Sequence, residues 1–167
     1  DHNMPPLISN PTVTSHQGFG KKPVSDTLEW ENQLGNLAVG HSDKLNISFE
    51  NLANDKGVQI LNTLINEFRA SMLVSVLKLS TRYIMLTVGV EVFKLFLEDF
   101  FNQYKPKQFG TDEALNFLEY LRKRDLQWTI LDQLMNFEES LIYTLIDGEI
   151  RIVKFSHNPL PLLTALF

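Results

Sequence analysis

The sequence contains no cysteine, and it contains few histidines. The first absence excludes disulfides, thiolate zinc sites, iron–sulfur clusters and thiol catalysis, and it fits a reducing compartment. No two histidines share metal-ligand spacing on one expected helix. The sequence therefore predicts no metal and no cofactor. The four histidines are His2, His16, His41 and His157.

Long apolar runs and nucleotide-binding loops are also missing. No apolar run reaches the roughly 18 residues of a membrane span, and residues 1–22 are polar, without the apolar core of a signal peptide. There is no Gly-rich phosphate loop and no Gly-x-Ser-x-Gly nucleophile elbow. We expect a cytoplasmic protein that does not associate with a membrane and is not an enzyme.

Positive charge is in deficit. The net charge is −5 and the pI is near 5.3, whereas a nucleic-acid binder gains most of its affinity by neutralising phosphates. The densest basic cluster, residues 122–124, is followed directly by Asp125 and is typical of a solvated helix end. This balance argues against nucleic acid as a partner.

Large apolar side chains, in contrast, are plentiful. Hydrophobic residues make up 44% of the 167 residues, including twelve phenylalanines, which is enough for one compact core without a disulfide or metal. Helical periodicity predicts helices that start near residue 25, over 58–79, after Gly89, after Thr111 or Asp112, and over 127–145. The side chains expected to face inward are Leu61, Ile65, Phe68, Met72, Val76 and Leu79 in the second helix, and Leu131, Leu134, Leu141 and Leu145 in the last.

The pattern changes near the C-terminus. Asp147 and Gly148 form a typical turn pair, and residues 149–155 are rich in β-branched residues with partial alternation, which predicts a strand. Residues 159–167 are very apolar and form either a short helix or the start of a larger appendage. The expected fold is mainly α, a helical bundle with a small C-terminal β-containing appendage. Its parts are a disordered leader (1–24), the bundle (25–146), and the strand with an apolar tail (147–167).

Two charged residues lie inside apolar stripes. Arg69 is four residues after Ile65 and three before Met72, and Glu138 is four after Leu134 and three before Leu141. A buried charge is costly unless it is paired. We therefore expect Arg69 and Glu138 to be buried and to form a structural ion pair that fixes the helix register, rather than to act in catalysis.

Residues 60–143 carry a family resemblance. The runs 66–73 (Asn-Glu-Phe-Arg-Ala-Ser-Met-Leu), 89–93, 100–106, 117–121 and 131–138 resemble a helical family once labelled a DNA-binding domain. Its members accompany multinuclear non-haem iron-dependent oxidases that modify ribosomally made peptides. The resemblance implies a non-catalytic partner protein that docks on the oxidase, which holds the iron ligands, and presents the precursor peptide. The alternative is a helical regulatory or DNA-binding domain.

The C-terminal part supplies candidate surfaces for these two tasks. A lone strand after a helical bundle has unpaired edges that can accept an extended peptide, unless it pairs with another strand of the same chain. The candidate peptide-binding residues are Glu149, Ile150, Arg151, Ile152, Val153, Lys154 and Phe155. An apolar tail that remains exposed is a candidate docking patch. Its residues are Pro159, Leu160, Pro161, Leu162 and Leu163.

Overall fold

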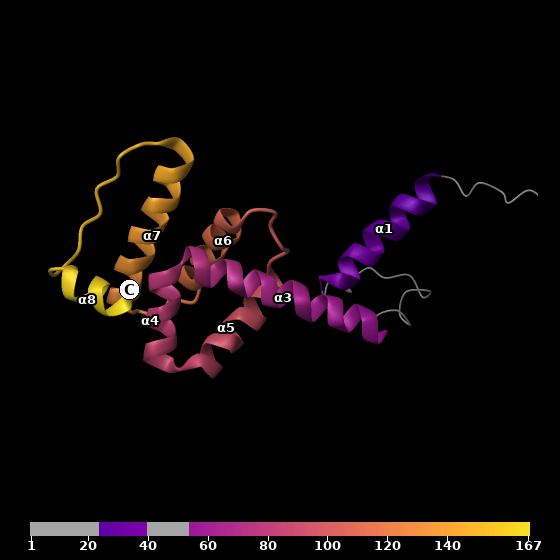
Figure 1. The fold of residues 1–167 in the computed structure, drawn as a ribbon, viewed down its shortest axis with the longest axis horizontal. Coiled ribbons are helices and arrows are strands. Elements are labelled where there is room, and N and C mark those ends of the chain that lie inside the picture. Colours follow the sequence, from indigo (N-terminus) through magenta and orange to yellow (C-terminus); the bar gives the residue numbers. More distant parts are fainter. Residues whose placement is uncertain (1–23, 40–53) are drawn as a thin grey trace, which may run out of the picture.

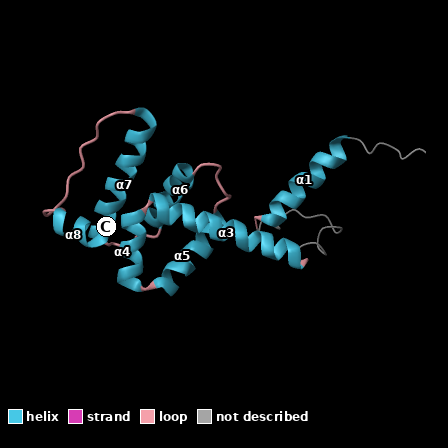
Figure 2. Cartoon of the chain, viewed as in Figure 1, coloured by secondary structure: helices cyan, strands magenta, loops and turns pink. Residues whose placement is uncertain are grey.

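The computed structural model describes residues 24–39 and 54–167. Within these residues the regular secondary structure is entirely helical, and loops connect the helices (Figures 1 and 2). The mainly α prediction is therefore confirmed, and the predicted C-terminal strand is not seen in this part of the chain. The expected leader falls almost entirely outside the described residues. The helices are α1 (Val24–Ala38), α3 (Lys56–Val76), α4 (Lys78–Val88), α5 (Val90–Gln103), α6 (Gly110–Lys123), α7 (Thr129–Asp147) and α8 (Leu160–Leu166).

The helices are arranged around α3 and α4 (Figure 1). The long α3 contacts α1 near its first half and packs on α6, while the shorter α4 contacts α5, α7 and α8. The main core lies between these elements, and it is rich in aromatic side chains. Phe100 of α5 is at its centre, with ring centroids 5.1 Å from Phe117 and 5.5 Å from Tyr120 of α6. Other fully buried members are Leu73, Leu77, Ile84, Leu118, Leu121 and Leu131.

The helix expected over residues 58–79 is broken at Leu77. The backbone of Leu77 leaves the helical region, with φ −101° and ψ 54°, and α4 then continues at an angle of 105° to α3. Glu138 of α7 accepts hydrogen bonds from the first N–H groups of α4, which supports this new helix start. Among the described residues, no single helix has the length and hydropathy to cross a membrane, and α3 and α4 meet that test only as a bent pair.

Part of each predicted inward stripe is exposed. Leu61 and Phe68 on α3 are 44% and 64% exposed, and Leu141 and Leu145 on α7 are 48% and 82% exposed. These four inward assignments were wrong, because the apolar surface of α3 and α7 extends beyond the part that neighbouring helices cover. The buried residues of α3 are Arg69 and Leu73.

Two helix boundaries coincide with glycines at positive φ, and a third, at α6, differs from the prediction. Gly89, with φ 90°, separates α4 from α5, and Gly148, with φ 74°, ends α7 at the predicted turn pair; both angles favour glycine. At α6 the prediction was wrong, since Phe109 is the N-cap residue and no side chain caps this end. Gly110 lies here against α3, where an added Cβ would be 3.4 Å from Val76 Cγ2.

We predict that Phe117→Ala lowers the free energy of unfolding by about 3–5 kcal/mol, because it removes a ring from the closed aromatic core. Phe68→Ala is the matched control. Since Phe68 is largely exposed, its truncation is expected to change stability by less than about 0.5 kcal/mol. Urea denaturation of both variants tests this, and equal losses would contradict the assignment of Phe68 to the surface.

Candidate functional site

Arg69 and Glu113 form a buried ion pair between α3 and α6. The guanidinium Nε of Arg69 lies 2.6 Å from Oε1 of Glu113, and the side chains are 1% and 0% exposed. Nη2 of Arg69 donates to the carbonyl of Tyr104 at 2.7 Å, and Oε2 of Glu113 accepts from the backbone N–H of Lys107 at 2.8 Å. The pair therefore also fixes the loop between α5 and α6.

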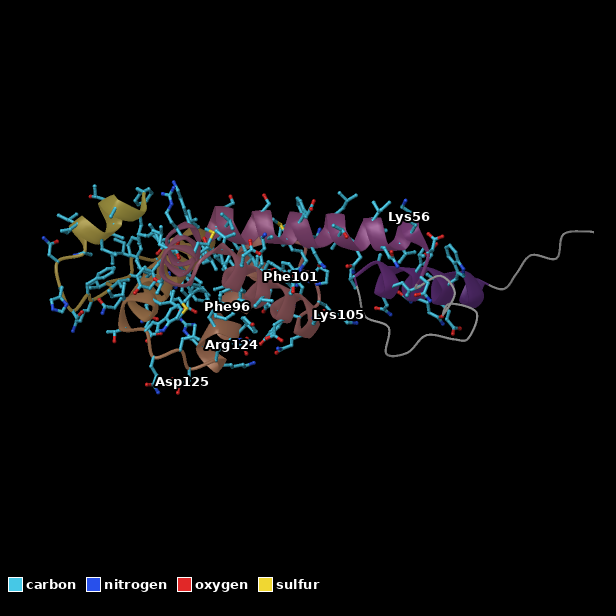
Figure 3. The ribbon with its side chains drawn as sticks, turned by 90° about the horizontal axis from the view of Figure 1, so that it is seen from below. Lys56, Phe96, Phe101, Lys105, Arg124 and Asp125 are labelled. Atoms are coloured by element: carbon cyan, nitrogen blue, oxygen red, sulfur yellow. The ribbon has the colours of Figure 1, made fainter. Side chains whose placement is uncertain are left out.

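The guanidinium of Arg69 stacks on an aromatic ring. Its Cζ lies 4.3 Å from the ring centroid of Phe101, which Figure 3 shows between α3 and α5. Burial lowers the pKa of Arg69, and the hydrogen bond and charge of Glu113 oppose this shift. Nη1 is buried and makes no hydrogen bond with any described residue, so one donor of the guanidinium has no described acceptor.

Glu138 is also buried, but its partners are backbone groups. Its two carboxylate oxygens accept from the N–H groups of Leu79 at 2.6 Å and Ser80 at 3.0 Å. A helix start leaves such N–H groups without partners inside the helix, and Leu77 supplies no side-chain cap. Glu138 thus caps α4 from another helix. Burial raises the pKa of Glu138, and hydrogen bonds from Ser80 and Leu79 oppose this shift.

The predicted burial of Arg69 and Glu138 is confirmed, but their predicted pairing was wrong. The bend at Leu77 carries the start of α4 to Glu138, while Arg69 lies on the stretch of α3 that packs on α6. Glu113 is not among the predicted site residues. The signal was present, since Glu113 lies four residues before the core residue Phe117 and so falls inside the apolar stripe of its helix.

An open groove of about 400 Å³ lies over the Arg69 cluster. Its walls come from α3, the end of α1 and the loop between α5 and α6, and its polar members are Arg69 and Lys107. Phe68 and Leu64 stand at its edge and are more than half exposed. The apolar lining residues are Val39, Leu64, Ile65, Phe68, Met72 and Pro106. The groove is thus an apolar surface with a basic rim.

Basic residues differ in whether they have acidic partners. Arg122 binds Glu139, Lys123 binds Glu119, and Arg124 binds Asp99. Figure 3 shows Arg124 beside Phe96, and the distance from its Cζ to the ring centroid is 5.2 Å. These three pairs confirm the prediction of a solvated helix end.

Lys105 and Lys107, next to the groove, are exposed and form no ion pair with any described residue. Figure 3 labels Lys105 at the end of α5. The groove rim therefore carries unneutralised positive charge, in contrast to the end of α6.

Residues 149–155, the predicted strand, form an extended segment that runs back beside α7 (Figure 1). One end is fixed by Arg151, whose Nη1 donates to Asp147 Oδ1 at 2.8 Å. The other is fixed at Ser156, whose N–H donates to Gln133 Oε1 at 3.0 Å. The strand assignment was wrong because no second strand of the described residues lies beside the segment. The backbone groups of residues 150–155 form no hydrogen bond with any described residue.

The side chains of this segment alternate in burial. Phe155 packs on Phe137 of α7, with ring centroids 5.8 Å apart, and Arg151 lies over the Tyr143 ring at 5.4 Å. Ile150 and Ile152 point away and are 94% and 89% exposed. The predicted period of two is thus present in the packing, without the predicted ladder.

The predicted docking tail, residues 159–163, lies at the start of α8. Leu162 and Leu163 pack against a small cluster of Leu79, Leu134 and Leu166. Leu160 remains 67% exposed. The tail is therefore a short helix attached to α4 and α7, and only its outer side is open.

Each oxygen of the two buried carboxylates has one structural partner. Both oxygens of Glu113 and both oxygens of Glu138 accept hydrogen bonds. The described residues contain no group of three or more side chains that could hold a metal ion. No protein-family model, curated protein or solved structure matches the chain. The apolar surfaces that stay open among the described residues include the α3 groove and the outer face of the extended segment.

We predict strong energetic coupling between Arg69 and Glu113. Arg69→Met and Glu113→Leu should each cost about 3–5 kcal/mol, because each leaves the other charge buried and unpaired, and the double variant should recover much of this loss. Arg69→Met with Glu138→Leu is the control and should be additive within about 0.5 kcal/mol. Chemical denaturation measures both cycles. Coupling between Arg69 and Glu138 instead would contradict the observed pairing.

We further predict a pH dependence that originates from Glu138. Its pKa in the folded chain is raised above the ordinary value of 4.5, so the folded state binds this proton more tightly than the unfolded state. The associated stability is present below the ordinary pKa and is lost as pH rises through the folded pKa. Relative to the non-titrating variant Glu138→Gln, the wild type should therefore gain stability as pH falls from neutral toward the ordinary value of 4.5. A stability difference that is constant over this range would refute the prediction.

Proposed function

We propose that the chain is a non-catalytic binding module that docks on another protein and holds an extended peptide along residues 149–155. The observation that carries the proposal is the free backbone of residues 150–155, which lies extended with both ends fixed by side chains. A peptide that pairs with such a backbone gains main-chain hydrogen bonds without a matching sequence of side chains. Its own alternate side chains then provide selectivity.

The fixed ends favour capture because they reduce the loss of freedom on binding. The Arg151 side chain binds Asp147, and the backbone N–H of Ser156 binds Gln133. Neither contact uses a backbone group of residues 150–155. A segment that is already extended loses less conformational entropy when a peptide binds. The exposed Ile150 and Ile152 add apolar surface on the outer face.

The non-catalytic part of the proposal is supported by Glu113 and Glu138. Both carboxylates are buried, and a buried carboxylate in a cleft is a candidate for a catalytic acid or base. Their oxygens are occupied by Arg69, by the N–H of Lys107, and by the start of α4. A general acid or base needs an oxygen that can reach a substrate proton, so we assign both residues to structure.

The partner in this proposal comes from the family resemblance of residues 60–143. It is a multinuclear non-haem iron-dependent oxidase, and the peptide is the ribosomally made precursor that this oxidase modifies. Co-expression with an oxidase of that kind tests the docking part. The expected result is a complex that persists through size-exclusion chromatography, and two separate peaks at micromolar concentration would contradict it.

We predict that a proline in the extended segment weakens peptide binding from one edge only. Consecutive residues of an extended chain direct their N–H groups to opposite edges, so Ile152→Pro and Val153→Pro each remove a donor from a different edge. One variant should bind a labelled peptide of alternating valine and threonine about tenfold more weakly, which corresponds to one lost hydrogen bond, while the other keeps its affinity. Fluorescence anisotropy measures both.

The helical bundle serves as the internal control for this pair. Neither residue donates a backbone hydrogen bond within the described chain, so circular dichroism and thermal unfolding should be unchanged in both variants. Equal affinity in wild type and in both variants, with the fold intact, would discard capture by strand pairing. The docking part would then have to be judged on the oxidase complex alone.

A further inference from the structure

Helix α3 carries an apolar row that the described residues leave exposed. Ile60, Leu64 and Phe68 follow each other at intervals of four and are 52%, 56% and 64% exposed. Residues four apart lie on the same side of a helix, and Met72 continues the row into the groove. At 1.5 Å per residue, the row from Ile60 to Met72 is about 18 Å long. It offers ridges to a second helix over about three turns.

The charges beside this row differ between its two flanks. Lys107 lines the groove on one flank, and Lys105 precedes it in the same loop. The other flank carries Glu67 together with Lys56, along a shallower hollow of α3. The first flank is therefore purely basic, and the second is of mixed charge. Neither Lys105 nor Lys107 has an acidic partner among the described residues.

We propose that the α3 row and groove form the docking site for an amphipathic helix of another protein, with acidic side chains on the flank that meets Lys105 and Lys107. The inference deepens the proposed function, on which it rests, by naming the docking surface. The occupant is a helix because the row has helical spacing and the length of a helix face. The partner helix is acidic on one flank because Lys105 and Lys107 lie on one flank of the row. Acidic side chains at that position attract the lysines and avoid like-charge repulsion.

The buried ion pair keeps this surface in place. Arg69 forms part of the groove floor, and its partner Glu113 holds the N–H of Lys107, so the α3 wall and the basic loop are joined by one cluster. The rim lysine is thereby held next to the apolar row before any partner binds. A preformed site of this kind loses little freedom on association.

The test uses the full chain and two labelled helical peptides of about 20 residues, long enough to form helix. Both carry leucines on one face. One has glutamates along a flank, and the other has lysines at the same positions. In about 0.15 M salt, the glutamate peptide should bind at least about tenfold more tightly in fluorescence anisotropy, even though the whole chain is acidic. Equal affinity for the two peptides, or a preference for the lysine peptide, would overturn the proposal.

Three substitutions locate the binding. Phe68→Ser should lower affinity for the glutamate peptide about tenfold or more, with thermal unfolding unchanged because Phe68 is exposed. Leu95→Ser is the matched control, since Leu95 is 60% exposed on α5 and does not line the groove, and it should bind as the wild type does. Lys107→Glu should reduce or reverse the preference between the peptides. Equal losses in Phe68→Ser and Leu95→Ser would overturn the assignment to α3.

Two further measurements separate this inference from its alternatives. Sedimentation equilibrium of the chain alone should show a monomer, and a dimer that Phe68→Ser dissociates would replace the partner helix by a second copy of this chain. Ile152→Pro should bind the glutamate helix normally. If the wild type captures the extended peptide but does not bind the glutamate helix, the α3 site is refuted and the proposed function stands. If the wild type binds the glutamate helix but does not capture the extended peptide, only the strand-edge mechanism is refuted.

Discussion

The structure depends on one buried carboxylate at the point where the backbone changes direction. Glu138 receives two N–H groups at the start of α4, and in this way α7 supplies what the local sequence around Leu77 lacks. Helix starts are normally completed by a neighbouring polar side chain. Because the cap here comes from α7, the bend and the packing of α4 on α7 are a single feature. The positions of α5 and α8, which both contact α4, follow from it.

The Arg69–Glu113 pair plays the corresponding part on α3. Each of the two buried clusters joins a charged side chain to backbone groups that no helix satisfies, at Tyr104 and Lys107 in one case and at Leu79 and Ser80 in the other. Buried charges are tolerated when they are paired and hydrogen-bonded, and among the charged groups of these two clusters only Nη1 of Arg69 lacks a described partner. Together the clusters fix the part of α3 near α6 and α4. Other apolar residues of α3, such as Phe68, remain on the surface.

Much of this fold follows from the sequence, and the limits of prediction have physical causes. Gly89 and the pair Asp147–Gly148 mark boundaries correctly, because a positive φ is a local property. The burial of Arg69 and Glu138 also follows from local periodicity. The partners of these two residues could not be predicted, because pairing depends on how the helices are placed in space. The break at Leu77 changes the direction of the chain and therefore the neighbours of the residues that follow.

The extended segment shows a similar division between local and tertiary information. Alternation over residues 149–155 was detected, and it corresponds to real contacts of Arg151 and Phe155 with α7. A strand, however, needs a partner, and nothing in a single segment states whether one is present. The exposure of Phe68 was missed for the same reason, since an apolar stripe does not reveal how much of it is covered. The candidate site consists largely of these apolar surfaces that remain uncovered.

The extended segment is also a site at which a protease can cut the chain. Exposed backbone without hydrogen bonds is where proteases nick folded proteins, and Lys154 offers an exposed basic residue within it. A trypsin-like cut after Lys154 would sever α8 from the rest of the chain. The short helix would still be held by Leu166 in its apolar cluster and by the bond from Arg82 Nη1 to the Leu166 carbonyl at 2.6 Å. A bound peptide would cover the same backbone, so occupancy and resistance to degradation would rise together.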